Sequence, residues 1–139
     1  MVVSLQKTKT KTKTKKKEEK TMAKKRMISC EIIESDKFYA LSPTAQAIYF
    51  HLNLNADDDG VVDNWQSIIR TMKARKEHLS ALFDSELLLQ LPNGAIFITH
   101  WSKHNSISPG RYIPGIYRNE LTKLIAQGVI KKNHGEIRN

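Results

Sequence analysis

The sequence predicts a mostly helical α+β domain. Apolar residues recur at helical spacing in four segments, and two β-prone runs surround one Asn-Gly pair. With 139 residues, 40% hydrophobic and 27% charged, the chain has room for one modest core. No apolar run approaches the roughly 20 residues that cross a bilayer, so no membrane partner is expected. The single cysteine, Cys30, excludes a disulfide framework and fits a reducing cytoplasm.

The first helix is expected to begin at Ser42 and Pro43. The serine can cap it, and proline suits a first turn because no N–H is needed there. One face then recurs at i, i+3, i+4 and i+7: Ala45, Ile48, Tyr49 and Leu52. The helix is expected to end within residues 53–55, before a turn at residues 57–60 and the apolar pair Val61-Val62. Ahead of this helix, residues 27–33 alternate weakly and predict a short extended lead-in.

Two further helices are expected to follow. Asp63 or Asn64 is predicted to cap the second helix, whose buried stripe is Trp65, Ile68, Ile69 and Met72. Residues 73–76 break that stripe. The third helix is predicted to point Leu79, Leu82 and Phe83 inward, and Lys76, Glu77 and Ser80 outward.

A hairpin and a last helix complete the pattern. Residues 87–91 and 95–99 surround Pro92-Asn93-Gly94, which is a strong hairpin signal. Beyond it, Trp101 is expected to pack the hairpin onto the helices, while His100 and His104 hydrogen-bond. Residues 106–114 are loop-like, and a helix is predicted over residues 116–127. Its inward face is Tyr117, Leu121, Leu124 and Ile125, and Gly128 stands where it would stop.

The order helix, short strand, helix, turn, helix and hairpin is that of a winged helix-turn-helix with a β-hairpin wing and an extra C-terminal helix. The hairpin would supply the fourth wall of a core that three short helices cannot close alone. The expected organisation is a basic disordered tail over residues 1–26, a winged-helix domain over 27–105, a loop and helix over 106–130, and a frayed end over 131–139.

The net charge of +9 belongs to the tail. Residues 1–26 hold eleven Lys and Arg against two Glu, whereas residues 27–139 hold twelve of each sign. A Lys-Thr repeat over residues 7–17 has no apolar face, so disorder is expected. Three alternatives stay open: a basic arm for nucleic-acid phosphates, an idle solubilising tail, or a segment 1–21 that is not translated. The last arises because Lys17-Glu18-Glu19-Lys20 can encode a purine-rich ribosome-binding core shortly before Met22.

Basic residues also segregate within the domain. In a helix-turn-helix, the start of the second helix of the motif enters the major groove of DNA. Side chains suited to phosphates or base edges gather at that position and after the hairpin. The predicted DNA-binding residues are Arg70, Lys73, Arg75, Lys76, His78 and Ser80, together with Lys103 and Arg111. The alternative is a solvated face on a protein-interaction module.

No metal, cofactor or enzymatic chemistry is expected. Residues 55–63 imitate a calcium loop, but Gln66 stands where calcium needs a bidentate carboxylate. The acids of residues 57–59 are instead expected to form a turn and to favour the start of the next helix. His100 and His104 have a metal-like spacing without a neighbouring carboxylate or cysteine. The chain has neither a nucleophile elbow nor a Gly-rich phosphate loop.

With these residues in view, residues 22–119 resemble the N-terminal domain of phage replisome organisers, which are related to the DnaD-like primosomal proteins. Several blocks occur in the right order: Met22-Ala-Lys-Lys-Arg-Met27, residues 32–38, residues 41–52, residues 56–62, Ile98-Thr-His-Trp101, His104-Asn105, Arg111-Tyr112 and Tyr117. The family begins where Met22 stands.

The resemblance implies a winged-helix domain that serves DNA replication initiation in a bacterial host cell. Such domains bind double-stranded origin DNA or self-associate into homo-oligomers, and they help to bring the replicative helicase, its loader or other replisome proteins. The sequence departs in two ways. Arg75 stands where members usually have a small capping residue, and fuller members continue into a second domain. A transcription regulator and a pure oligomerisation module remain rival interpretations, because fold does not fix function.

Overall fold

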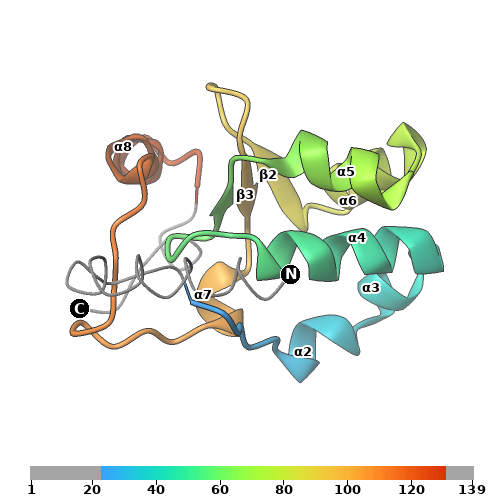
Figure 1. The fold of residues 1–139 in the computed structure, drawn as a ribbon, viewed down its shortest axis with the longest axis horizontal. Coiled ribbons are helices and arrows are strands. Elements are labelled where there is room, and N and C mark those ends of the chain that lie inside the picture. The colour runs from blue at the N-terminus through green and yellow to red at the C-terminus, as the bar shows by residue number, and fades with distance from the viewer. Residues whose placement is uncertain (1–22, 131–139) are drawn as a thin grey trace, which may run out of the picture.

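The computed structural model describes residues 23–130. The Lys-Thr repeat of residues 7–17, the start at Met22 and the end after residue 130 lie outside the described residues. Within them the chain is α+β and mostly helical, with seven helices and one three-stranded antiparallel sheet (Figure 1). The elements are α2 (Cys30–Ile33), α3 (Asp36–Tyr39), α4 (Pro43–Leu54), β1 (Val61–Val62), α5 (Trp65–Met72), α6 (Lys76–Asp84), β2 (Leu88–Gln90), β3 (Ile96–Ile98), α7 (Trp101–His104) and α8 (Arg118–Ala126).

Helix α4 is built as the sequence predicts. The Ser42 hydroxyl accepts the N–H of Ala45 at 3.1 Å, and Pro43 is the first helical residue. The four predicted inward residues are fully buried, and α4 packs against both α5 and α6. The burial of Ile68, Leu79 and Leu82 confirms the inward faces of α5 and α6, with the remaining predicted residues partly buried against the same core.

The predicted cap of α5 is wrong in its chemistry. Asn64 occupies the capping position, but its side chain makes no capping hydrogen bond. The neighbouring carboxylate of Asp63 accepts the Tyr117 hydroxyl at 2.7 Å. A partner 54 residues away has thus taken the group that the local pattern assigned to the helix.

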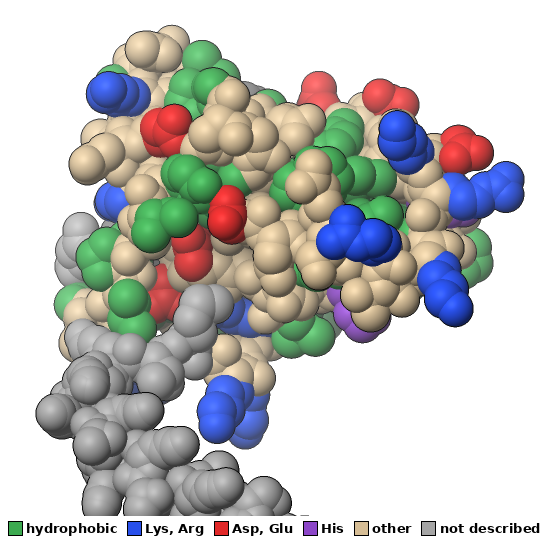
Figure 2. All heavy atoms as spheres, turned by 45° about the horizontal axis from the view of Figure 1, so that its top comes forward, with side chains coloured by type: hydrophobic (Ala, Val, Ile, Leu, Met, Phe, Trp, Pro, Cys, Tyr) green, Lys and Arg blue, Asp and Glu red, His purple; other side chains and the backbone are tan. Residues whose placement is uncertain are grey.

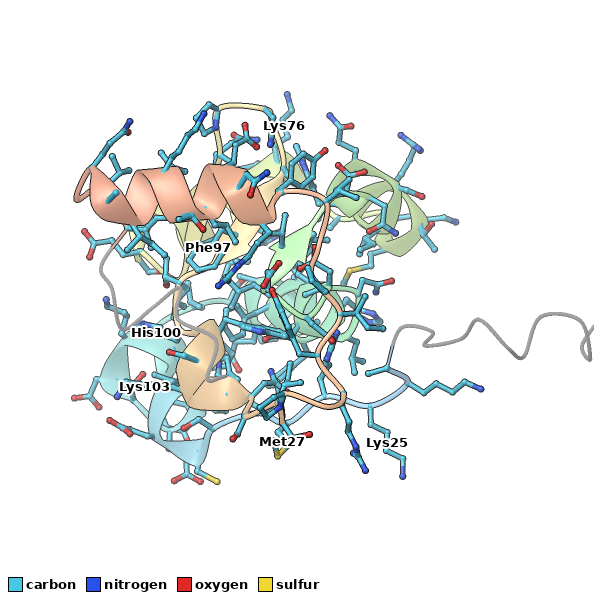
Figure 3. All side chains as sticks on the ribbon, turned by 90° about the vertical axis from the view of Figure 1, so that its left-hand side faces the viewer. Lys25, Met27, Lys76, Phe97, His100 and Lys103 are labelled. Carbon is cyan, nitrogen blue, oxygen red and sulfur yellow. The ribbon has the colours of Figure 1, made fainter. Side chains whose placement is uncertain are left out.

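The sheet is a layer between helices, and its strand order is β1-β3-β2. Val61 pairs with Phe97, which pairs with Leu89, so these three side chains share one face. That face lies under α8, as Figure 3 shows for Phe97. Val62 and Ile96 point to the opposite face, into the core formed with α4 to α6. Because both faces are covered, all three residues of β3 are buried.

The predicted extended lead-in over residues 27–33 is wrong from Cys30 onward. The stretch ends in the short helix α2. Helices α3 and α7, which were not predicted either, are likewise single helical turns. Ser35 caps α3 by accepting the N–H of Phe38, whose ring is fully buried 5.4 Å from that of Tyr49. One turn is too short to show a 3.6-residue period, which explains why the sequence pattern missed these helices.

The hairpin and the last helix match their predictions closely. The hairpin turns at Asn93-Gly94, where the Asn93 side chain accepts the N–H of Ala95. Helix α8 begins two residues later than expected, which leaves Ile116 80% exposed. None of the helices in residues 23–130 is long and apolar enough to span a membrane.

Candidate nucleic-acid interface

The connection between α5 and α6 is a three-residue turn at Lys73, Ala74 and Arg75. Lys73 is left-handed, with φ 57°, and the N–H of Ala74 bonds to the Ile69 carbonyl at 3.2 Å, which closes α5. Ala74 packs against the core, whereas Arg75 is extended and begins α6 without a side-chain cap. The turn therefore anchors its middle residue and presents the two basic residues on either side.

Five of the predicted side chains of this region are exposed to solvent. They are those of Arg70, Lys73, Arg75, Lys76 and Ser80. Figure 2 shows Lys and Arg side chains, with acidic ones among them, over the end of the molecule where α5 and α6 lie. We call the five residues the α6 face.

One ion pair crosses the α6 face and is weak. The Arg75 Nε lies 3.8 Å from a Glu77 carboxylate oxygen, with side chains 71% and 69% exposed. At that exposure the solvent screens the pair almost completely. The guanidinium is therefore available to another anion.

His78 has a partner inside the protein. It is half-buried, and its Nδ1 lies 3.0 Å from the Ser42 hydroxyl. That hydroxyl oxygen already accepts the N–H of Ala45, so its hydrogen is free to be donated to the imidazole. His78 thus links the start of α6 to the cap of α4.

Lys103 and Arg111 do not join the α6 face. Lys103 lies on α7, and its Nζ is 3.7 Å from a Glu31 carboxylate oxygen. In Figure 3 it lies on the opposite side of the molecule from Lys76. Arg111 is exposed in the loop after α7, where it lines a separate cleft.

The acidic turn of residues 57–59 has a role that the sequence did not indicate. Asp57 accepts the N–H groups of Asp59 and Val61, which stabilises the turn itself. Asp59 accepts the Tyr112 hydroxyl at 2.5 Å and the N–H of Gly115 at 2.8 Å. A Cβ on residue 115 would lie 2.1 Å from an Asp57 oxygen, so only glycine allows this approach. The acids of this turn therefore hold the loop that leads to α8.

Arg26 belongs to the folded part of the chain, although the sequence places it in the basic tail. Its side chain is only 4% exposed and lies 2.9 Å from an Asp58 oxygen. It also donates to the Ala56 carbonyl at 2.8 Å and stacks over the Trp101 ring at 5.1 Å. The two residues before Arg26 are basic as well, so nothing in the local sequence indicates that the side chain of Arg26 is the buried one.

Trp101 is buried in the core, where it contacts the acidic turn and the side chain of Arg26. It is 1% exposed, and its indole N–H donates to the Asp58 carbonyl at 2.9 Å. A Cβ on residue 60 would lie 2.5 Å from the indole, and Gly60 has φ +85°. The ring can lie on this turn only because a glycine is there.

His104 hydrogen-bonds at both nitrogens. The N–H of Ser29 donates to its Nδ1 at 2.9 Å, so the neutral ring carries its proton on Nε2, 2.7 Å from the Tyr49 oxygen. Burial, with the neighbouring His100, lowers the pKa of His104 to about 4. Between about pH 6.5 and pH 4 the unfolded chain binds this proton and the folded chain does not, so His104 lowers the free energy of unfolding as the pH falls through that range.

Asp57 has the opposite effect on the pH dependence of stability, because it adds stability as the pH falls. Burial, with a smaller contribution from the charge of Asp59, raises the pKa of Asp57 from 3.8 to about 6, although the N–H of Val61 partly offsets the shift. Because the folded-state pKa is the higher one, the ionised carboxylate lowers the free energy of unfolding above about pH 6. That penalty disappears as the pH falls through 6 toward 4.

We therefore expect Asp57→Asn to stabilise the protein at neutral pH. Its Oδ1 can still accept both N–H groups, while the desolvated charge is gone. The expected gain in the free energy of unfolding is about 1–3 kcal/mol at pH 7.5, shrinking to nothing near pH 4. Denaturant melts at several pH values measure it, with Glu34→Gln at an exposed carboxyl as control. A gain that does not depend on pH would contradict the assigned cause.

Within residues 23–130, no group of three or more His, Cys, Asp or Glu is placed to hold a metal ion. Comparisons of the chain with protein-family models, with curated proteins and with solved structures gave no match. The function proposed below depends on the chain's own residues.

Proposed function

We propose that the chain is a DNA-binding winged-helix protein whose α6 face contacts double-stranded DNA. The observation that carries this proposal is the start of α6: Lys73, Arg75 and Lys76 are exposed, on a helix whose other side buries Leu79 and Leu82. A helix held by one side and basic at its exposed start is suited to the major groove.

The element order supports the winged-helix interpretation. Helix α4 is followed by β1, by the α5–α6 pair and by a hairpin that pairs with β1 through β3. The hairpin residues 87–99 contain no charged side chain. Attraction to phosphates therefore falls to α6 and its preceding turn, rather than to the wing.

We assign the protein to DNA replication initiation in a phage or prophage, because the sequence blocks resemble those of replisome organisers. Footprinting separates this role from transcription regulation. Protection of a replication origin within its own gene cluster supports the assignment, whereas protection of a promoter supports the regulator.

A second candidate is a protein-interaction module. A cleft of about 590 Å³ lies beside β1 and the segment before α8, and its rim carries Leu54 and Ile116, 53% and 80% exposed. Exposed apolar side chains around a concavity favour a protein partner. The two candidate functions differ in whether the exposed basic residues of α6 are needed for binding the partner.

Changing Arg75 and Lys76 together to Ala is expected to weaken DNA binding without lowering stability, because exposed charges contribute little to folding. Each lost phosphate contact reduces the slope of log affinity against log salt by roughly one unit. A lost base contact instead costs about 1–3 kcal/mol and relaxes preference at one position. Fluorescence anisotropy with duplex DNA at several salt concentrations separates the two roles.

The matched control is Lys123→Ala, which removes one exposed charge from α8. Each single variant, Arg75→Ala and Lys76→Ala, is compared with it in the full chain. If the double variant binds every duplex as well as the parent does, α6 does not read DNA, and the interaction module becomes the better interpretation.

Deleting residues 1–21 tests the tail. If these residues are translated, they offer only phosphate contacts, which add affinity without sequence preference. The deletion is expected to flatten the salt dependence and to leave the preferred site unchanged in footprinting. Loss of that preference would show that the tail does more than neutralise phosphates.

A further inference from the structure

A second cleft lies on the side of the molecule away from the α6 face. It has a volume of about 890 Å³, and its walls are the N-terminal segment and the loop after α7. The Met27 N–H donates to Asn105 Oδ1 at 2.9 Å, and the Ser29 N–H to His104, so the two walls are tied together. Figure 3 shows Lys25 and Met27 on one side of the molecule and Lys76 on the other.

The lining of this cleft has hydrogen-bond donors to spare. Lys25 and Arg111 are exposed, and neither forms an ion pair with another residue of the part that the structure describes. The Arg26 Nε and the Asn105 Nδ2 are buried donors without an acceptor among residues 23–130. Ser106 and Ser108 add hydroxyl groups.

The only carboxylate of the lining is already satisfied. Asp58 is 7% exposed; one oxygen pairs with Arg26 and the other accepts the N–H of Ile113 at 2.9 Å. The two exposed basic side chains of the lining, Lys25 and Arg111, thus have no free carboxylate beside them among the lining residues. This combination selects an anion over a cation.

We propose that this cleft binds the phosphate backbone of a nucleic-acid strand, as a second site separate from the α6 face. The lining has no aromatic residue on which a base could stack, so the contact is to phosphates. The volume suits a strand of a few nucleotides, whereas a duplex is too wide to enter. One molecule can then hold two nucleic-acid segments.

The test uses the full chain and a short fluorescein-labelled oligothymidylate, which has no base preference to satisfy. Arg111→Glu is compared with Lys123→Glu, an identical charge change on exposed α8. Combining Lys25→Glu with Arg111→Glu is expected to weaken binding about tenfold and to reduce the salt slope by roughly 1.4, since each phosphate contact on a single strand contributes about 0.7. Because every variant keeps the same tail, the difference reports on the cleft.

A direct readout comes from side-chain nitrogen NMR. The Arg26 Nε–H and Asn105 Nδ2 signals are expected to shift when the oligothymidylate is added to the parent, and to stay in place with Arg111→Glu. Equal affinity of Arg111→Glu and Lys123→Glu, or no shift of either signal in the parent, would overturn the proposal. Equally tight binding of inorganic pyrophosphate would also overturn it, because the site would then take free phosphate rather than a strand.

The outcome is independent of the α6 face. In an Arg75→Ala, Lys76→Ala background, the effect of Arg111→Glu on oligothymidylate binding is expected to persist unchanged. If α6 does not bind duplex DNA, the proposal of a second site is unaffected. If the cleft does not bind the oligothymidylate, the proposal for α6 is unaffected.

Discussion

Replacing Trp101 with Ala is expected to lower the free energy of unfolding by about 3–5 kcal/mol, the usual cost of removing a large buried aromatic side chain. The indole is 1% exposed and contacts the acidic turn and the buried Arg26, within the same hydrophobic core as the buried residues of helix α4. Its removal leaves a cavity beneath Gly60 and an unpaired carbonyl at Asp58. A domain of this size has little more stability than that to lose. Urea unfolding followed by circular dichroism measures the change.

Trp101→Phe separates packing from hydrogen bonding. The smaller ring keeps most of the apolar contact and loses the N–H donated to Asp58, so a smaller loss of about 1–2 kcal/mol is expected. Trp65→Ala serves as a comparison, because that indole is only half-buried and donates to Gly94 at the hairpin turn. If Trp101→Ala costs no more than Trp65→Ala, the stabilising role of Trp101 is wrong.

The second large effect is expected at the Arg26–Asp58 pair. Asp58→Ala leaves a guanidinium 4% exposed without its carboxylate, and breaking a buried pair in this way costs about 3–5 kcal/mol. The variant also frees the N–H of Ile113, so the loop that leads to α8 should loosen. Hydrogen exchange of the loop amides measures that loosening beside the global unfolding.

A double variant tests whether the cost comes from the charge left behind. Changing Arg26 to Met together with Asp58→Ala removes both charges, so stability should recover in part relative to Asp58→Ala alone. If the double variant is less stable than the single one by the full cost of Arg26→Met, the two residues act independently. The interaction between Arg26 and Asp58 would then contribute as little to the free energy of unfolding as an exposed ion pair does, despite its burial.

The sequence predicted the elements whose signals are local. Ser42-Pro43 marks the start of α4, and Ala45, Ile48 and Leu52 mark its buried face, because a cap and a period need only neighbouring residues. The hairpin at Asn93-Gly94 is recognisable for the same reason. By contrast, α2, α3 and α7 are single turns with no period to read, and tertiary contacts decide their form.

The candidate site divides along the same line. The basic residues flanking the α5–α6 turn could be named from the sequence, because exposure follows from the inward face of α6. The roles of Arg26 and Asp58 could not, since their partners lie 30 and 55 residues away. Arg111 lies away from the α6 face because of the path that the chain takes after α7, and neither composition nor residue spacing indicates that path.

The buried sheet has a consequence for how the chain is made. On the ribosome, β1, β2 and β3 can pair once residue 98 has emerged, and α4 to α6 are then present to cover one face. The face formed by Val61, Leu89 and Phe97 stays bare until α8 follows. Between those two moments the nascent protein exposes this apolar face of the sheet to solvent. Chaperones bind surfaces of this kind, and such surfaces promote aggregation. The synthesis of the residues from 99 to the end of α8 at Ala126 therefore sets the duration of this interval.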